Sequence, residues 1–188
     1  MLKQYALGLF EISLFMRIGV SRFNHDFKHF LQSFIALGLT LPFTLISVPH
    51  LYWAKDDLRS SSLDVVTMLF GIKFFVSAAL LVGFSYIICN VLHKGSLFLK
   101  YVTISNWVTL IPLLLYIPCL YVMSRGLQTY DVVYPFLIVF SVYGYAMGTF
   151  IAKHVLKIPW ELAVFVGICS MAISEGCYKL LFFIANIV

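Results

Sequence analysis

The stretch WELAVFVGICSMAISEGCYKLLFFIANIV, Trp160 to Val188, decides the fold. It contains no turn signal and is longer than the roughly 20 apolar residues that cross the hydrocarbon core of a bilayer. Glu175 and Lys179 lie within it, one helical turn apart on the same face. Ionisable side chains at such depth are costly and normally face protein or water rather than lipid. The stretch therefore predicts a transmembrane helix that needs other helices around it.

The whole chain has the composition of a membrane protein. Of its 188 residues, 62% are hydrophobic and only 11% are charged, and the mean hydropathy is +0.97. A soluble domain carries roughly a quarter charged residues, and a chain this short has too little interior to bury so much apolar surface in water. The basic residues behind the net charge of +5 are scattered between apolar runs, so we expect no nucleic-acid partner. We expect an all-α polytopic membrane protein whose main partner is the lipid bilayer.

Polar segments divide the chain into a short amino-terminal region, 1–27, and a five-helix transmembrane domain, 28–188. Each apolar run in this domain is long enough to cross the membrane as a helix. The predicted spans are 30–51, 63–92, 97–122, 132–151 and 160–187. An odd number of spans places the two ends of the domain on opposite sides of the bilayer.

The amino-terminal region predicts an amphipathic helix at residues 2–20, followed by a linker. Charges in mid-run argue against a signal peptide and against a span. Three polar side chains are expected to face water: Lys3, Gln4 and Glu11. Three large apolar side chains are expected to face lipid: Phe10, Leu14 and Phe15. This pattern is typical of a helix that lies in the membrane interface.

The distribution of bases predicts the orientation of the chain. The amino-terminal side has eight, namely Lys3, Arg17, Arg22, Lys28, Lys94, Lys100, Lys153 and Lys157. The other side has three, namely Lys55, Arg59 and Arg125. Because cytoplasmic loops carry the excess of Lys and Arg, we expect a cytoplasmic amino terminus. The basic side is also expected to attract anionic lipid headgroups.

Two intramembrane charges are expected to meet. Glu175 lies roughly 20 Å from the cytoplasmic face, and Lys73, in the second span, lies roughly 13 Å from the opposite face. In a core about 30 Å thick the two depths nearly coincide. We therefore predict an ion pair between Lys73 and Glu175, with Lys179 beside it. Two roles stay open: a structural clamp between helices, or an ion relay in a small permease or channel component.

Three further residues in the spans are candidates for helix packing. Asn106 is expected to hydrogen-bond across helices, and it completes the predicted intramembrane polar cluster with Lys73, Glu175 and Lys179. Gly144 and Gly148 have the spacing of a close-approach face, within the chain or between two copies. We find no phosphate-binding loop, nucleophile elbow or HExxH motif. No catalytic residue, cofactor or metal is therefore expected.

The chain resembles the Yip family of five-span membrane proteins, including its bacterial branch. The residues that carry the resemblance are Phe30 and Ser33-Phe34 at the start of the first span and Asn106-Trp107 in the third. The resemblance implies a non-enzymatic membrane-organising or protein-interaction component with a cytoplasmic amino terminus. It favours a bacterial inner membrane, with a eukaryotic endomembrane as the alternative. Membrane-protein partners or self-association would follow.

A third possibility is an accessory subunit of a larger membrane complex. Such a subunit would present a polar or Gly-rich face toward lipid. A water-accessible cavity that reaches Glu175 would instead favour the permease.

Overall fold

The computed structural model describes residues 2–24 and 26–184, and every regular element in these ranges is helical. Residues 1 and 25 of the expected amino-terminal region and residues 185–187 of the expected fifth span lie outside the described residues. The elements in chain order are α1 Leu2–Ser13, α2 Arg17–Ser21, α3 Phe27–Ala54, η1 Asp56–Ser60, α4 Leu63–Val91, η2 Gly95–Leu97, α5 Phe98–Val108, α6 Leu110–Ser124, α7 Tyr130–Leu156 and α8 Trp160–Ile184.

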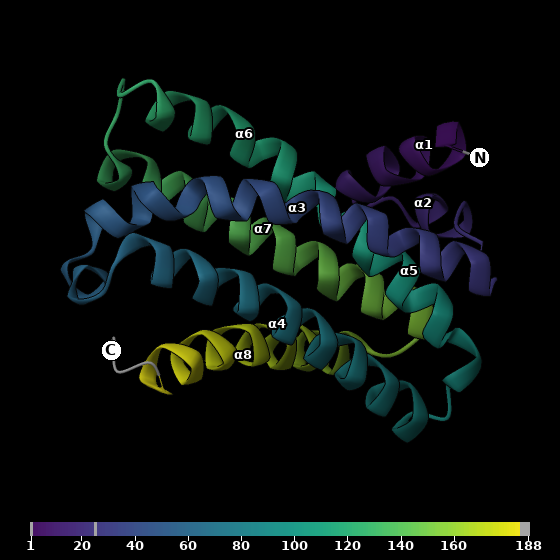
Figure 1. Ribbon diagram of the computed structural model, residues 1–188. Helices are drawn as coiled ribbons and strands as arrows, with labels where there is room; N and C mark the ends of the chain where they lie inside the picture. Colours follow the sequence, from purple (N-terminus) through teal and green to yellow (C-terminus); the bar gives the residue numbers. More distant parts are fainter. Residues whose placement is uncertain (1, 25, 185–188) are drawn as a thin grey trace.

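The long helices run up and down in a bundle (Figure 1). α1 and α2 pack at the end where α3 begins and where α7 turns into α8, and the loops after α3 and α6 lie at the other end. The helices and turns at this end of the bundle carry the eight bases of the amino-terminal side. We therefore call this the basic end, and the other the opposite end.

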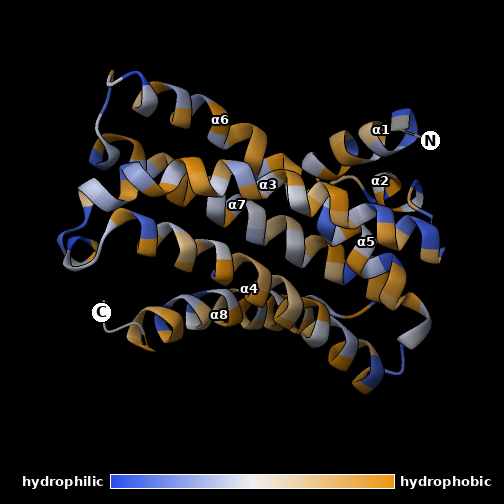
Figure 2. Ribbon diagram, in the orientation of Figure 1, coloured by the Kyte–Doolittle hydropathy of each residue, from blue (hydrophilic) through white to orange (hydrophobic). Residues whose placement is uncertain are grey.

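Five segments are long and apolar enough to cross a membrane: Phe27–Ala54, Leu63–Val91, Gly95–Ser124, Tyr130–Leu156 and Trp160–Ile184. Only 11% to 22% of the most apolar window of each is buried within the chain. Figure 2 shows hydrophobic residues along the helices and hydrophilic residues gathered in the loops at both ends. Outward apolar surface of this extent needs lipid as its solvent. The prediction of an all-α polytopic membrane protein is confirmed.

The third span is not the continuous helix expected at 97–122. α5 ends at Val108 and α6 begins at Leu110, with Thr109 between them. Pro112 provides a physical reason, because it has no N–H to donate to the carbonyl of Val108 and its ring crowds that carbonyl. The chain therefore bends near the middle of the segment Gly95–Ser124, and α6 diverges from the direction of α5 (Figure 1).

Buried side chains form one large cluster at the basic end and two smaller ones at the opposite end. The large cluster joins α1 and α2 to α4, α5, α7 and α8, and includes Tyr5, Ile104 and Ile151. A second cluster joins α3, α4 and α8 around Phe70 and Phe182. A third joins α6 to α7 and consists of Leu120, Met123 and Val133. The basic end therefore holds most of the internal packing.

Candidate functional site

The amino-terminal segment is a helical hairpin rather than the single helix expected at 2–20. α1 ends at Ser13 and α2 begins at Arg17. Between them, Phe15 has a left-handed backbone with a φ of 56°. A residue in this conformation cannot continue a right-handed helix, so the chain folds back and α2 packs against α1.

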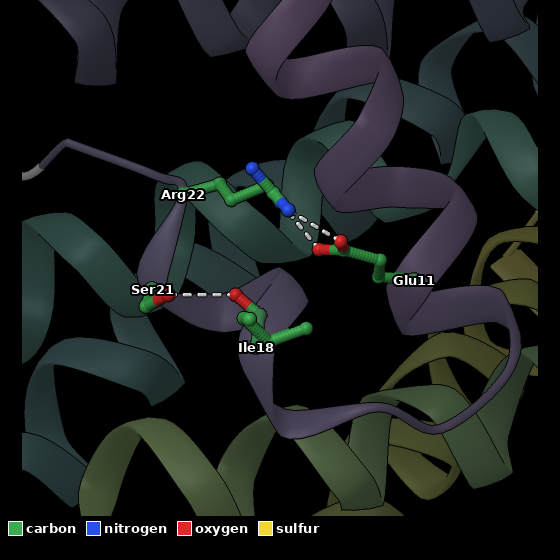
Figure 3. Close-up of polar contacts among 4 residues, drawn as sticks. All are labelled: Glu11, Ile18, Ser21 and Arg22. Carbon is green, nitrogen blue, oxygen red and sulfur yellow. Dashed lines mark hydrogen bonds and ion pairs between the residues drawn. The ribbon is translucent and has the colours of Figure 1, made fainter.

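Glu11 lies inside this hairpin and does not face water as expected. Arg22 Nε donates to Glu11 Oε2 at 2.5 Å, and Arg22 Nη2 donates to Glu11 Oε1 at 2.6 Å (Figure 3). The glutamate is 8% exposed, so its charge needs this partner. The hydrogen bonds from Arg22 lower the pKa of Glu11, and the same bonds raise the pKa of Arg22. The prediction for Glu11 is wrong because the fold-back brings Arg22 to it.

The outer surface of the hairpin presents both apolar and polar side chains. Phe10 and Leu14 are 62% and 56% exposed, and Phe15 is also exposed. Lys3 and Gln4 are exposed as well. This surface has the character of a segment that lies in the membrane interface.

The inner surface of the hairpin is fastened to the bundle. The ring of Tyr5 stacks on Phe23 with 4.9 Å between centroids and meets Trp107 of α5 edge-on at 5.7 Å. Tyr143 of α7 donates a hydrogen bond from its hydroxyl to the carbonyl oxygen of Ser13 at 2.5 Å. The hairpin is therefore part of the folded bundle, and its outer surface is held at a defined position.

Asn106 joins two spans at the basic end. Its Nδ2 donates to Ser33 Oγ at 2.9 Å, from α5 to α3, and its side chain is buried. Three residues of the Yip resemblance, Ser33, Asn106 and Trp107, therefore lie in the contact of α1, α3 and α5. Asn106 is far along the chain from Glu175 and does not share an ion pair or hydrogen bond with it in the described residues.

The ion pair predicted between Lys73 and Glu175 is not formed. The ion pairs of the described residues involve neither of them, nor Lys179. Lys73 Nζ lies 5.9 Å from the ring centroid of Tyr178. Glu175 is exposed on α8, within electrostatic range of Tyr145 on α7. Lys73 therefore approaches α8 at Tyr178, three residues from Glu175, but the carboxylate of Glu175 is exposed and no ion pair forms between the two in the described residues.

Glu175 and Lys179 belong to a face of α8 that the described helices leave uncovered. The opposite face of α8 is buried at Ala163, Val166 and Cys177, and Phe182, two turns after Glu175 on nearly the same side, is buried against Phe70 of α4. We call the uncovered surface the outer α8 face; it consists of Val164, Phe165, Ile168, Met171, Ala172, Glu175, Gly176, Lys179, Leu180 and Phe183. A carboxylate on a lipid-facing surface is energetically unfavourable. Lipid alone is therefore a poor environment for the outer α8 face.

Gly144 and Gly148 have different surroundings. A Cβ on Gly144 would lie 3.1 Å from Pro112 Cγ, so α6 packs closely there. A Cβ on Gly148 would meet nothing within 4 Å, because Gly148 lines a cavity. Gly144 is therefore a position of close approach within the chain, whereas no described helix approaches Gly148 as closely, and a contact between two copies there stays a prediction.

Two cavities lie within the bundle and share Thr109, Pro112 and Tyr116, at the break in the third span. One has a volume of about 500 Å³ and the other of about 350 Å³. Their further hydroxyl side chains are Thr40, Thr44, Ser47, Tyr130 and Ser174 in the first and Ser85, Tyr101, Ser105, Ser141, Tyr145 and Ser170 in the second. None of the described residues that line either cavity is charged, so the two cavities suit a neutral ligand with hydrogen-bonding groups.

The sequence prediction missed these hydroxyl side chains. Each of them is common in membrane helices, where it bonds to the carbonyl one turn back, as Thr44 does to Thr40 at 3.0 Å. One available signal was the position of Pro112 just after Thr109 in the middle of an apolar run. Another was the spacing of Thr40, Thr44 and Ser47 along one face of the first span.

Comparison of the chain with protein-family models, curated proteins and solved structures finds no match. The outer α8 face, the cavities and the basic end are therefore the features from which a function is inferred. The resemblance to the Yip family stays a prediction.

Proposed function

We propose that this chain is a non-enzymatic integral membrane protein that acts as an interaction component and assembles with a second copy through the outer α8 face. The exposed carboxylate of Glu175 carries the proposal. At 1.5 Å per residue, Glu175 lies roughly 22 Å from Trp160 and roughly 13 Å from Ile184. Lipid cannot solvate a carboxylate at this depth, and such groups normally face protein. A protein surface therefore covers Glu175 in the working assembly.

Charge complementarity favours a second copy of the chain as the protein that covers Glu175. In a symmetric pair with parallel α8 helices, the same face of each copy meets the other. Glu175 of one copy is then offset from Lys179 of the other by roughly 6 Å along the helix axis, a distance that a flexible lysine side chain spans. Two reciprocal ion pairs form, and the four charges sum to zero.

Small residues on the same face favour close approach. Ala172 and Gly176 are four residues apart, a spacing that lets two membrane helices come into contact. A Cβ on Gly176 would meet nothing within 4 Å in the single chain, so this space is free for a partner helix. Ile168 and Phe183, 60% and 69% exposed, would seal the charged centre from lipid.

The cellular setting is part of the same proposal. The excess of Lys and Arg at the basic end supports a cytoplasmic amino terminus. The Yip resemblance supports a bacterial inner membrane and a membrane-organising role for the assembly.

Energy transfer between donor-labelled and acceptor-labelled copies in liposomes tests the assembly. We expect transfer for the natural chain and its loss in Glu175→Lys, because like charges then face each other. The double change Glu175→Lys with Lys179→Glu restores opposite charges and should restore transfer. Gly176→Leu should reduce transfer, whereas Gly83→Leu should not, since Gly83 is an exposed glycine of α4 with nothing within 4 Å.

The proposal fails if the natural chain shows no transfer, or if Glu175→Lys transfers as well as the natural chain. A monomeric chain that copurifies with a different membrane protein through Glu175 would also overturn the second copy as partner. That result would instead support an accessory subunit of a larger complex.

A small permease component is the second candidate, and the hydroxyl-lined cavities favour it. They meet at an interrupted helix near the middle of the membrane, a feature that transporters use for binding sites. Here the binding groups are hydroxyls, since Glu175 and Lys73 line neither cavity.

Cysteine labelling tests this second candidate. In a chain without its natural cysteines, Thr40→Cys in the larger cavity should react with a water-soluble thiol reagent. Leu39→Cys is the matched control, because Leu39 is its neighbour in α3 and is 51% exposed on the outer surface. If neither Thr40→Cys nor Leu39→Cys reacts, water does not reach the larger cavity. That result would contradict the permease as a candidate function.

A further inference from the structure

A basic pocket of about 470 Å³ lies at the basic end, where α2 packs against α7 just before the turn into α8. Its lining residues are Arg17, Lys153, His154, Lys157, Ile158 and Pro159. Three of them carry a permanent positive charge and none carries a negative charge. The side chains come from α2, from the last turn of α7 and from the following turn. Only the folded chain brings them together.

The positive charges of this pocket have no acidic partner among the described residues. The ion pairs there involve neither Arg17 nor Lys153 nor Lys157. Lys100 lies within electrostatic range of Lys157 and adds a further positive charge nearby. Gathered like charges repel one another, so the basic pocket is complementary to a bound anion.

Local structure holds the cations in place. Lys153 Nζ lies 5.4 Å from the ring centroid of Trp160, at the start of α8. His154 stands between the rings of Phe150, at 4.4 Å, and Trp160, at 6.1 Å. Lys157 has a left-handed φ of 52°, at a helix end where glycine is the common residue.

The surroundings of the basic pocket suit a lipid better than a free anion. Met16 and Ile18, beside Arg17 in the chain, are 47% and 53% exposed, and Trp160 is 49% exposed. Tryptophan side chains gather at the level of the headgroups, and basic pockets between membrane helices bind anionic headgroups. Apolar surface beside the cations can receive the acyl chains.

We propose that the basic pocket binds the phosphate of an anionic phospholipid headgroup, with Arg17, Lys153 and Lys157 around it. This site joins the amino-terminal hairpin to the α7–α8 turn through the lipid. It goes beyond assembly through the outer α8 face and does not depend on it.

A binding titration of the full chain in detergent tests the site. The probes are short-chain phosphatidylglycerol, phosphatidylcholine with the same acyl chains, and inorganic phosphate, with the rise in melting temperature as the readout. We expect saturable stabilisation by phosphatidylglycerol, and at least about tenfold weaker binding of the other two, because each lacks either the net charge or the chains. Lys153→Gln and Lys157→Gln should each weaken phosphatidylglycerol binding about fivefold.

The matched control is Lys55→Gln, which removes the same charge at the opposite end. It should leave binding unchanged. Equal weakening by Lys55→Gln and Lys157→Gln would show only general attraction by net charge and overturn the site. Binding of inorganic phosphate as tight as that of phosphatidylglycerol would identify a free-anion site and overturn the lipid as ligand.

Discussion

Two acid–base couples in this chain, Glu11 with Arg22 and Glu175 with Lys179, have opposite environments. Glu11 is 8% exposed and receives two hydrogen bonds from Arg22. Glu175 and Lys179 are exposed and take part in none of the ion pairs of the described residues. Both acids lie in apolar surroundings that favour pairing. The fold supplies the partner for the first couple, whereas the second leaves room for a partner from outside the chain.

The two couples have different roles in the protein. The Glu11–Arg22 couple closes a hairpin and is part of the stability of the single chain. The Glu175–Lys179 couple forms none of the ion pairs of the described residues, and both side chains are exposed. Substitutions at the first couple should therefore change folding, and substitutions at the second should change association.

The largest effect is expected from Arg22→Ala. It leaves the carboxylate of Glu11 buried without a partner, which is more unfavourable than losing both charges. We expect a fall of several degrees in the melting temperature in detergent, measured by intrinsic fluorescence. Arg59→Ala is the control, since Arg59 lies in the exposed helix η1, where its ion pair with Asp56 at 3.2 Å and its hydrogen bond to the carbonyl of Trp53 are solvent-accessible and contribute little. Equal melting temperatures for the two variants would contradict the stabilising role of the Glu11–Arg22 pair.

Gly19→Ala should also open the hairpin. A Cβ on Gly19 would lie 2.6 Å from the carbonyl oxygen of Gly8 and 2.9 Å from Ile12. Overpacking of this kind costs about 1–3 kcal/mol. Gly176→Ala is the matched change on the outer α8 face, where nothing lies within 4 Å, and it should leave the unfolding free energy of the single chain almost unchanged. A similar loss of unfolding free energy in Gly19→Ala and Gly176→Ala would mean that the hairpin and the outer α8 face do not differ in their internal packing.

A pH titration isolates the contribution of Glu11. Because Arg22 lowers the pKa of Glu11, the stabilisation is fully present above pH about 4.3, the ordinary pKa of glutamate. It is lost as the pH falls through the lowered pKa of the folded chain. The difference in melting temperature between the natural chain and Glu11→Gln should therefore narrow below that pH. A constant difference down to the acid limit would mean that the carboxylate charge does not contribute.

The smallest effect on folding is expected from Lys179→Gln. In detergent dilute enough to keep the chain monomeric, the unfolding free energy should change by less than about 0.5 kcal/mol, as for other exposed positions. Association in liposomes should weaken in the same variant. A large loss of stability in the monomer would mean that Lys179 contributes to the folding of the single chain. That result would contradict its assignment to association.

Apolar run length was sufficient to predict the five membrane helices, because crossing a bilayer requires a helix of a certain length whatever its neighbours are. The amphipathic character of the first residues was also visible, and Phe10 and Leu14 are exposed as expected. The fold-back at Phe15 was not visible, since its left-handed backbone has no sequence signal such as glycine or asparagine. The pairing of Glu11 with Arg22 depends on that single turn.

The sequence by itself determined how deep each charge lies, because depth follows from position along a helix of known rise. Only the tertiary structure decided which way each charge points. Rotation of a helix about its axis depends on the packing of its neighbours, and α8 packs through Val166, Cys177 and Phe182. Glu175 is exposed, although Lys73 approaches α8 three residues away at Tyr178, and the basic residues at the start of α2 and at the end of α7 meet in one pocket.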